Sequence, residues 1–234
     1  MPASDFERRV AAVAWRSLRG CHGASDGSAG GAASRLGDVP GALRALAAAT
    51  DEDDDWSDAM EVLWSHVSHQ GDLYEGAPAV IPFVGERVDR PGRAGRATVA
   101  GSLATFAGLA AHASDGALAD ELRAAFAAAG ATIGTWLDGP VGDQAALICG
   151  AVPALHEVLA DGLAAAPALG AAAWLALAEL EPPPPWLIAR AEVALADPDP
   201  VRRAAAAALL ARRAAPTGAL AQRIRAALPP QAEA

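Results

Sequence analysis

Six acidic side chains lie within eight residues in the first half of the chain: Asp51, Glu52, Asp53, Asp54, Asp55 and Asp58. Carboxylates here cap the helical segment that follows and complement the positive end of its dipole. Five consecutive acids exceed what one cap needs, and a cationic partner would relieve their repulsion. We therefore predict that Asp51, Asp53, Asp54, Asp55 and Asp58 contact an electropositive protein. A solvated capping loop is the simpler alternative. Calcium is a third, although the run lacks the glycine and distal glutamate of an EF-hand.

A second group of polar side chains follows this acidic run. His66 and His69 are three residues apart on one predicted helix face, with Asp72, Tyr74 and Glu75 beyond it. Two histidines at this spacing could bind zinc together with a carboxylate. The favoured interpretation is a structural corner, in which His69 contacts the last helix carbonyls and Tyr74 fixes the turn. We predict that the exposed polar atoms of His69, Asp72, Tyr74 and Glu75 also contact the partner.

The nucleophilic side chains lack the neighbours that catalysis requires. Ser65 and Ser68 are close to His66 in sequence, but no G-x-S-x-G elbow is present. Cys149 lies in an apolar run that is typical of an inert, buried thiol. Cys149 and Cys21 are too few, and too poorly spaced, for a disulfide framework or a zinc site. We predict that the chain is not an enzyme and uses no metal or cofactor.

Arginine is concentrated toward the C-terminal end. Six of these side chains belong to the last two predicted hairpins: Arg202, Arg203, Arg212, Arg213, Arg223 and Arg225. They could bind an acidic surface of a partner. Alternatively, they keep a terminal repeat soluble.

Composition and charge restrict the fold and the partner. Of the 234 residues, 53% are hydrophobic and 20% are charged. Alanine is abundant and is the best helix former, whereas residues typical of strands are few, so we predict an all-α fold. The net charge of −10 opposes nucleic-acid binding, because phosphate contacts need surplus positive charge. It suits a basic protein partner.

The sequence shows no sign of export or membrane insertion. Its first residues lack the basic and apolar regions of a secretory signal. No apolar run of 18 residues is free of charged residues, glycine or proline. We predict a cytoplasmic protein with reduced cysteines and no membrane contact.

The expected elements follow one another in a single domain. Residues 1–19 form an N-terminal helix whose start, Ser4 to Glu7, fits a capping box; residues 20–37 form a flexible Gly/Ser loop, residues 38–228 helical repeats and residues 229–234 a tail. Within the repeats, helices are expected at 41–49, 56–70, 77–88, 97–112, 116–129, 142–160, 167–180, 185–196, 199–213 and 217–228. Such hairpins cannot bury their apolar faces alone, so they stack, as in an α-solenoid.

Short internal similarities also favour a repeat. VPGALRAL at 39–46, IPFVGERV at 81–88 and VPALHEVL at 152–159 share the spacing between a proline and its apolar neighbours. Pro82 and Pro153 each lie within a predicted helix and should bend it. The same kink in two repeats predicts a repeated curvature.

The clearest repeat signal lies at residues 197–210. Asp199 can cap a helix and Pro200 suits its first position, while Val201, Ala205 and Leu209 form an apolar seam from which Arg202 points away. This segment resembles the D-x-x-P-x-V-R-x-x-A-A-x-A-L signature of HEAT repeats. The resemblance implies a right-handed α-solenoid of about five helical hairpins.

A further stretch, from His69 to Phe83, is similar to an H-Q-G-x-x-Y-x-A-x-P-A-x-x-P-F segment of bacterial HEAT-like proteins, with Gly76 replacing the expected alanine. Some of these proteins are immunity partners of secreted toxins, and many toxin domains that attack nucleic acid are basic. Resemblance and charge together predict a non-catalytic protein that binds and neutralises a cognate bacterial toxin. The alternatives are a helical-repeat enzyme resembling a DNA glycosylase or a chromophore lyase, and an assembly scaffold.

Overall fold

The computed structural model describes residues 4–20, 23–24, 38–49, 55–69, 72–89, 95–112, 116–166, 169–214 and 216–228. Within these ranges the chain is all-α apart from two antiparallel hairpins of very short strands, which confirms the predicted fold class at this level. The helices of these ranges are all too short or too polar to cross a membrane. The chain divides into two compact units, Met1–Thr132 and Ile133–Ala234, and each is described by itself.

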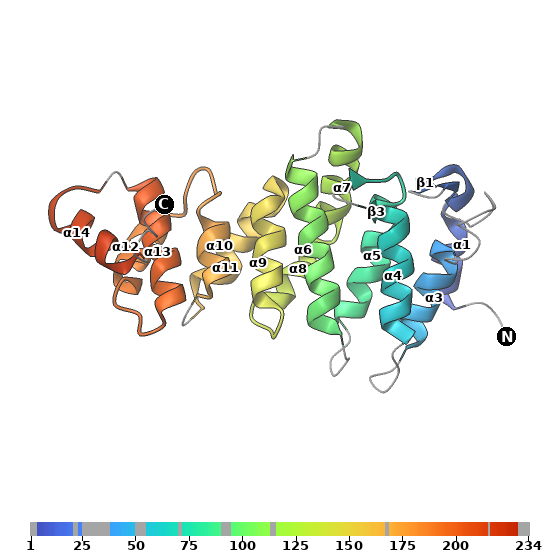
Figure 1. The fold of residues 1–234 in the computed structure, drawn as a ribbon, viewed down its shortest axis with the longest axis horizontal. Helices are drawn as coiled ribbons and strands as arrows, with labels where there is room; N and C mark the ends of the chain where they lie inside the picture. Colours follow the sequence, from blue (N-terminus) through green and yellow to red (C-terminus); the bar gives the residue numbers. More distant parts are fainter. Residues whose placement is uncertain are drawn as a thin grey trace, which may run out of the picture. The chain divides into compact units, whose positions relative to one another are not determined.

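Unit 1 is built from two helical pairs and a helix that covers one of them. Its elements are α1 (Asp5–Ala12), the 3₁₀ turn η1 (Trp15–Ser17), β1 (Arg19–Gly20), β2 (Gly23–Ala24), α3 (Val39–Ala48), α4 (Asp55–Val67), β3 (Ser68–His69), β4 (Asp72–Leu73), α5 (Ala77–Asp89), α6 (Arg96–His112) and α7 (Gly116–Ala128). α3 packs against α4, α5 packs against α6, and α7 contacts both α5 and α6 (Figure 1). Leu43, Leu63, Ile81, Leu103 and Phe126 are buried among these helices.

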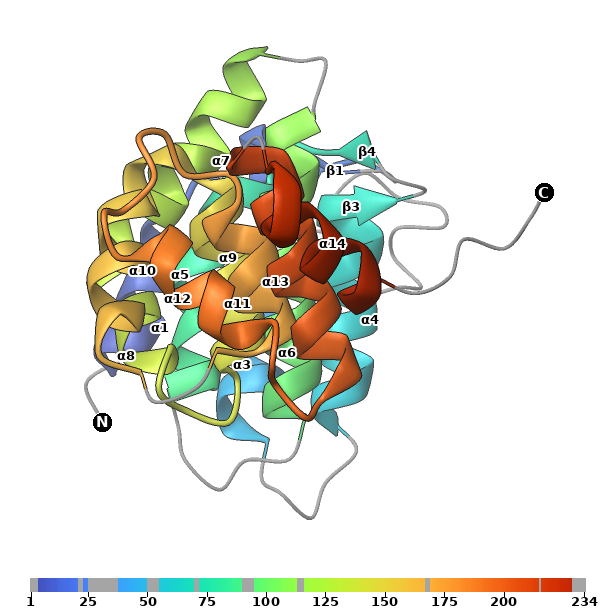
Figure 2. The ribbon, with the colours of Figure 1, turned by 90° about the vertical axis from the view of Figure 1, so that its left-hand side faces the viewer.

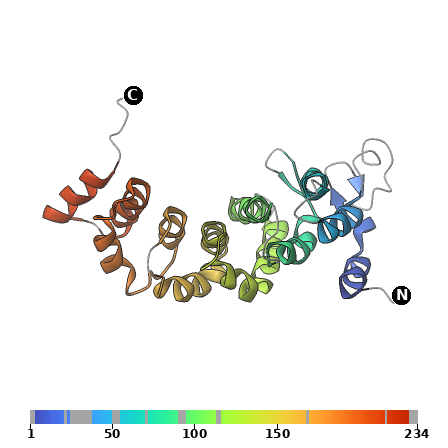
Figure 3. The same ribbon diagram turned by 90° about the horizontal axis from the view of Figure 1, so that it is seen from below.

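Unit 2 continues with shorter helices in two layers. Its elements are α8 (Gly130–Trp136), which contains the unit boundary, α9 (Gly142–Ala151), the 3₁₀ turn η2 (Pro153–Leu155), α10 (His156–Ala164), α11 (Ala171–Leu177), α12 (Leu187–Ala194), α13 (Pro200–Arg213) and α14 (Gly218–Ala227). Figure 3 shows α9, α11 and α13 side by side in one layer, with α10 and α12 in the other. α14 packs on α13 (Figure 2). Trp136, Ile148, Leu159 and Leu177 are core residues of this unit.

Among the described residues, Ser4, Asp38 and Asp199 cap the starts of α1, α3 and α13. Ser4 Oγ accepts from the Glu7 amide at 3.2 Å at the start of α1, as the capping-box pattern predicts. Asp199 accepts from the amides of Val201 at 2.8 Å and Arg202 at 3.3 Å, which confirms it as the cap of α13. Asp38 caps α3 in the same way. In α3 and α13 a proline occupies the first turn, where its missing N–H costs no hydrogen bond.

The helix expected over 142–160 is divided in two, which corrects that prediction. Val152, immediately before Pro153, has φ −114° and ψ 102°, an extended conformation that ends α9. Proline disfavours a helical conformation of the residue before it and has no N–H for a helical bond. Pro82, in contrast, lies inside α5. The two prolines are therefore not equivalent, and the repeated kink predicted from them is wrong.

Two further expectations about helices need correction. α8 was not expected, because Gly130, Gly134 and two threonines give its sequence a weak helix propensity; burial of Ile133 and Trp136 holds it in place. In α13, Ala205 and Leu209 are buried as predicted, but Val201 is 64% exposed, so the seam starts one turn later than expected.

Arginine side chains close the C-terminal ends of several helices. Arg87 donates to the carbonyl of Ala49 after α3 at 2.7 Å, and Arg123 donates to Ala110 in the last turn of α6 at 2.6 Å. In unit 2, Arg190 donates to the carbonyls of Leu163, Ala164 and Ala166 around the end of α10. Arg213 donates to Ala178 after α11, and Arg223 donates to Glu192 in the last turn of α12. These bonds bring donors to carbonyls at or just beyond helix ends, where backbone partners run out.

Candidate functional site

The acidic run leads directly into α4. Asp51, Asp53 and Asp54 lie outside the residues that the structure describes, as does the side chain of Asp55, the first residue of α4. Asp58 is exposed in the first turns of α4, where the helix dipole favours a negative charge. Asp55 thus begins α4, one residue before the expected helix start, and Asp58 lies in its first turns; the contact of these acids with a partner stays a prediction.

A groove of about 360 Å³ lies between α3 and α4, next to Asp58. The residues that line it are mostly small: Asp38, Gly41, Ala42 and Ala45 from the α3 side, and Asp58, Ala59 and Val62 from α4. Alanine and glycine keep the walls low, so the groove is open to a side chain from outside. We call this feature the α3–α4 groove.

The carboxylates at the α3–α4 groove differ in their availability. Asp38 is engaged as the helix cap, since its Oδ1 accepts from the Gly41 amide at 2.5 Å. Asp58 and the exposed Glu61 lie three residues apart on one face of α4, and neither forms an ion pair with a described residue. Arg44 on α3 pairs with Glu7 at 2.9 Å instead. Two like charges at this spacing repel each other, so the face favours an external cation.

The segment from His69 to Glu75 forms the connection between α4 and α5. α4 ends at Val67, earlier than the helix expected over 56–70, because Ser68 and His69 pair with Leu73 and Asp72 in an antiparallel hairpin. The Tyr74 amide donates to the Val67 carbonyl at 3.1 Å, and the Tyr74 carbonyl accepts from the Ala77 amide at the start of α5 at 2.8 Å.

The predicted contact residues in this connection have different surroundings. Asp72 is exposed and Tyr74 is half-buried, while the side chain of His69 lies outside the described part. Glu75 accepts from the Arg19 amide at 3.0 Å and from the Arg19 guanidinium at 3.1 and 3.0 Å. These bonds lower the pKa of Glu75 below its usual value, the backbone bond most of all. Glu75 therefore joins β1 to this connection, and a partner would have to compete with Arg19 for it.

Contrary to the expectation from the sequence, the two histidines considered for zinc do not share one helix face. His66 is fully buried in α4, whereas His69 belongs to strand β3. Among the residues that the structure describes, no three His, Cys, Asp or Glu side chains come close enough together to hold a metal ion.

Cys149 is a buried thiol in α9, as its apolar sequence context predicts. Burial raises its pKa to about 12, because the thiolate would lose its hydration. At neutral pH the side chain is therefore a protonated, weakly nucleophilic group packed in the core of unit 2.

The C-terminal arginines serve contacts within unit 2. Arg202 pairs with Asp197 at 3.3 Å and Asp199 at 3.5 Å, and Arg203 donates to the Asp197 carbonyl at 2.7 Å. Arg212 forms a bidentate pair with Glu179, and Arg213 contacts Glu181 as well as Ala178. Arg223 and Arg225 donate to helix carbonyls. An acidic partner surface would have to compete with these bonds.

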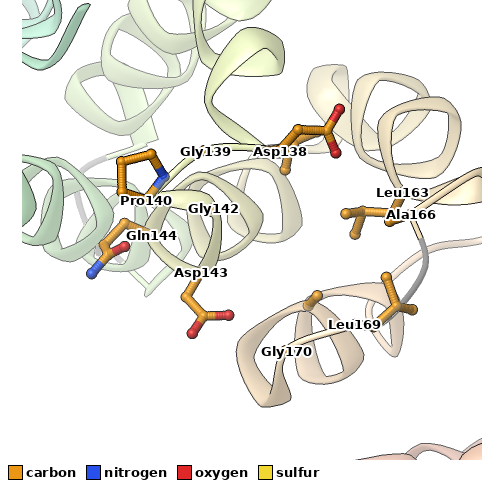
Figure 4. A pocket seen from close by; sticks show the side chains of 12 residues that line it. Asp138, Gly139, Pro140, Gly142, Asp143, Gln144, Leu163, Ala166, Leu169 and Gly170 are labelled. Carbon is orange, nitrogen blue, oxygen red and sulfur yellow. The ribbon is translucent and has the colours of Figure 1, made fainter. Parts of the chain in front are cut away.

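Unit 2 also contains a pocket that the sequence did not indicate. Its volume is about 450 Å³, and it lies between the α8–α9 connection and the segment that joins α10 to α11. Figure 4 shows the carboxylates of Asp138 and Asp143 on the first side, and Leu163, Ala166, Leu169 and Gly170 on the other. Isolated aspartates beside glycine and proline are typical of ordinary turns, so the sequence around them did not predict a pocket.

A scan against protein-family models, a search of curated proteins and a search of solved structures found no match for this chain. The functional interpretation therefore depends on the geometry and charge of the two surfaces described above.

Proposed function

We propose that the chain is a non-catalytic protein-binding module that recognises a basic segment of another protein through the α3–α4 groove. The observation that carries this proposal is the pair of exposed carboxylates on α4, Asp58 and Glu61. Asp58 lines the groove and Glu61 lies one turn further along α4. Neither forms an ion pair with a described residue. Arginine or lysine side chains of a partner supply the missing charge.

The acidic run adds negative charge close in sequence to the groove residue Asp58. Asp51, Asp53 and Asp54 immediately precede α4 in the sequence, and Asp55 is its first residue. A field of one sign around a cleft raises the rate of encounter with an oppositely charged partner. The acidic run therefore speeds association with the basic partner, and the groove provides the specific contact with one of its side chains.

The size and lining of the groove also fit an extended basic side chain. Ala42, Ala45 and Ala59 form low apolar walls, against which the methylene groups of lysine or arginine pack. The charged end then lies close to Asp58. This arrangement uses both halves of an amphipathic side chain.

Neutralisation of a bacterial toxin is the specific form of this function that we favour. It combines the acidic charge of the chain with the resemblance of residues 69–83 and 197–210 to bacterial HEAT-like proteins. The layered helical pairs of each unit are compatible with the proposed repeat architecture of HEAT-like hairpins. A basic toxin domain that attacks nucleic acid is the partner expected on this basis.

The proposal is tested by capture of the partner from the native cell with the purified chain. The decisive variant is Asp58→Asn/Glu61→Gln, which removes both charges from the face of α4. We expect the captured amount of a basic protein to fall by at least about tenfold at low salt. Asp53→Asn/Asp54→Asn/Asp55→Asn should reduce the rate of association more than the final affinity.

A matched control uses a similar acidic pair elsewhere. Glu157 and Asp161 are exposed one turn apart on α10, and neither forms an ion pair with a described residue. The change Glu157→Gln/Asp161→Asn removes the same charge and should leave capture unchanged. Equal capture by the α4 variant and the wild type would refute the role of the groove.

If the partner is a toxin, co-expression should restore growth, and unrelieved growth inhibition would reject the immunity function.

A further inference from the structure

The pocket of unit 2 has the size of a small-molecule site. Its volume of about 450 Å³ falls in the range typical of ligand pockets, about 300–1,000 Å³. Buried side chains of Leu137, Leu163, Leu169 and Ala173 contribute its apolar lining. Asp138 and Asp143 are the charged residues of its lining, and both are exposed to solvent.

The two carboxylates have no cation of their own. Neither Asp138 nor Asp143 forms an ion pair or hydrogen bond with a described residue, whereas every arginine of unit 2 pairs with a carboxylate or donates to a carbonyl within the unit. Arg190 bonds the carbonyls of Leu163 and Ala166 but does not line the pocket. Both carboxylates face solvent, so an external cation can reach them without displacing a protein partner.

Gly170 leaves room for the Asp143 carboxylate. A Cβ atom on Gly170 would collide with Oδ1 of Asp143, so this carboxylate lies directly over the backbone at the start of α11. Figure 4 shows the Asp143 carboxylate directed toward the segment of Gly170, with Asp138 further along the same connection.

We infer that this pocket binds a small aliphatic cation with an amine or guanidine at its ends, whose charges are neutralised by Asp138 and Asp143 and whose methylene groups contact the leucines. The inference does not depend on the proposed function of unit 1. It concerns a different surface and a different set of residues.

The experiment is a calorimetric or NMR titration of the full chain with agmatine, which carries an ammonium and a guanidinium on a four-carbon stem. We expect saturable binding at low salt, with shifts confined to the residues that line the pocket. Asp138→Asn/Asp143→Asn should weaken it by at least about tenfold, since both charge pairs are lost. Gly170→Ala, which displaces the Asp143 carboxylate, should weaken it as well.

The controls separate this site from general attraction to an acidic protein. Glu157→Gln/Asp161→Asn changes the net charge equally and should leave agmatine affinity within about twofold of the wild type. N-butylurea, a neutral analogue of similar shape, should not bind. Equal loss in both double variants, binding of N-butylurea, or no saturation with agmatine would each overturn the inference. Thermal unfolding of each variant shows that it is folded.

The same titration identifies the source of the cation. N-acetylarginine amide carries one guanidinium, as an arginine side chain of a protein does. If agmatine binds more tightly, the second charge is used and the ligand is a free diamine or alkylguanidine. If the two bind equally and both depend on Asp138 and Asp143, the pocket receives an arginine side chain of a partner.

Discussion

At the scale of single residues, burial sets the chemistry of Cys149. Its pKa is raised to about 12 by the loss of thiolate hydration. We predict that the Cys149 thiol of a Cys21→Ser variant resists iodoacetamide at pH 8 in the native state. It should react at the rate of a free cysteine once guanidinium chloride unfolds the chain. Mass spectrometry of quenched samples measures both rates, and rapid labelling of the native variant would contradict the burial of this side chain.

A second residue-scale prediction concerns the cap of α13. Hydrogen bonds from the amides of Val201 and Arg202 lower the pKa of Asp199 below its ordinary value. The charged carboxylate therefore stabilises the fold above the unfolded-state pKa of about 3.9. This contribution is lost as the pH falls from that value through the lower folded-state pKa.

The measurement for this cap is the free energy of unfolding of the wild type and Asp199→Ala between pH 7 and pH 2. We expect the variant to be less stable at neutral pH and the difference to shrink below about pH 4. Asp161→Ala, which changes an exposed carboxylate outside any cap, is the control and should show little difference at any pH. A difference for Asp199→Ala that does not change with pH would contradict the role assigned to its charge.

The roles that the sequence predicted correctly are those that depend on neighbouring residues alone. Ser4 and Asp199 were identified as caps because the cap and the amides it accepts from lie within three residues of each other. The bond between Glu75 and Arg19 joins residues 56 positions apart, and no local pattern indicates it. Pattern gave equally little reason to expect the full burial of His66.

At the scale of helices, arginine rather than lysine caps the C-terminal ends of the helices. One guanidinium has five N–H donors and can bond several carbonyls at once, as Arg190 does at the end of α10. We predict that Arg190→Lys lowers the free energy of unfolding by about 1–3 kcal/mol, because a lysine ammonium cannot reach all three carbonyls. Arg225→Lys is the control, since Arg225 bonds only its own helix at Ala221. Equal stability of both variants in chemical denaturation would reject this role.

The close approach of α9 and α11 gives a second prediction at this scale. A Cβ atom on Gly150 would lie 2.7 Å from the Cβ and 2.9 Å from the Cα of Ala176, so one helix must shift to accept it. We expect Gly150→Ala to destabilise the chain by about 1–3 kcal/mol through overpacking. Gly108 in α6 has open space around its Cβ position. Gly108→Ala should stabilise by about 0.5–1 kcal/mol, as a helix-interior alanine does. Opposite signs in thermal unfolding would confirm the close packing, and a stabilising Gly150→Ala would contradict it.

Helix positions were predicted well where the apolar residues recur at regular helical spacing. They were predicted poorly where tertiary packing or a proline determines whether the helix forms. The segments around α5, α6, α7 and α13 were anticipated within a few residues. α8 was missed because its glycines and threonines disfavour a helix and only its packed neighbours hold it. The break before Pro153 is a steric effect of one residue that an averaged apolar pattern conceals.

At the scale of the whole molecule, composition predicted the all-α class, because alanine dominates and strand formers are rare. It did not predict a division into two compact units, since that depends on contacts between distant segments. The same limit applies to both surfaces described above. The sequence drew attention to the acids of α4 but not to the groove beside them, and the pocket of unit 2 is assembled from two connections that look like ordinary turns.

The charge of the molecule leads to the last prediction. The chain has 28 acidic residues against 18 arginines, and many of the described arginines already contact carboxylates or carbonyls. An arginine-rich peptide should therefore bind, and its affinity should fall steeply between 0.1 and 1 M NaCl, as the screening length drops from about 10 Å to about 3 Å. Fluorescence anisotropy measures this, with a citrulline-substituted peptide as the uncharged control. Asp58→Asn/Glu61→Gln should weaken binding and flatten its salt dependence, while duplex DNA should not bind. A peptide affinity independent of salt would show that apolar contacts, rather than the surplus carboxylates of α4 and its flanking acids, hold the partner.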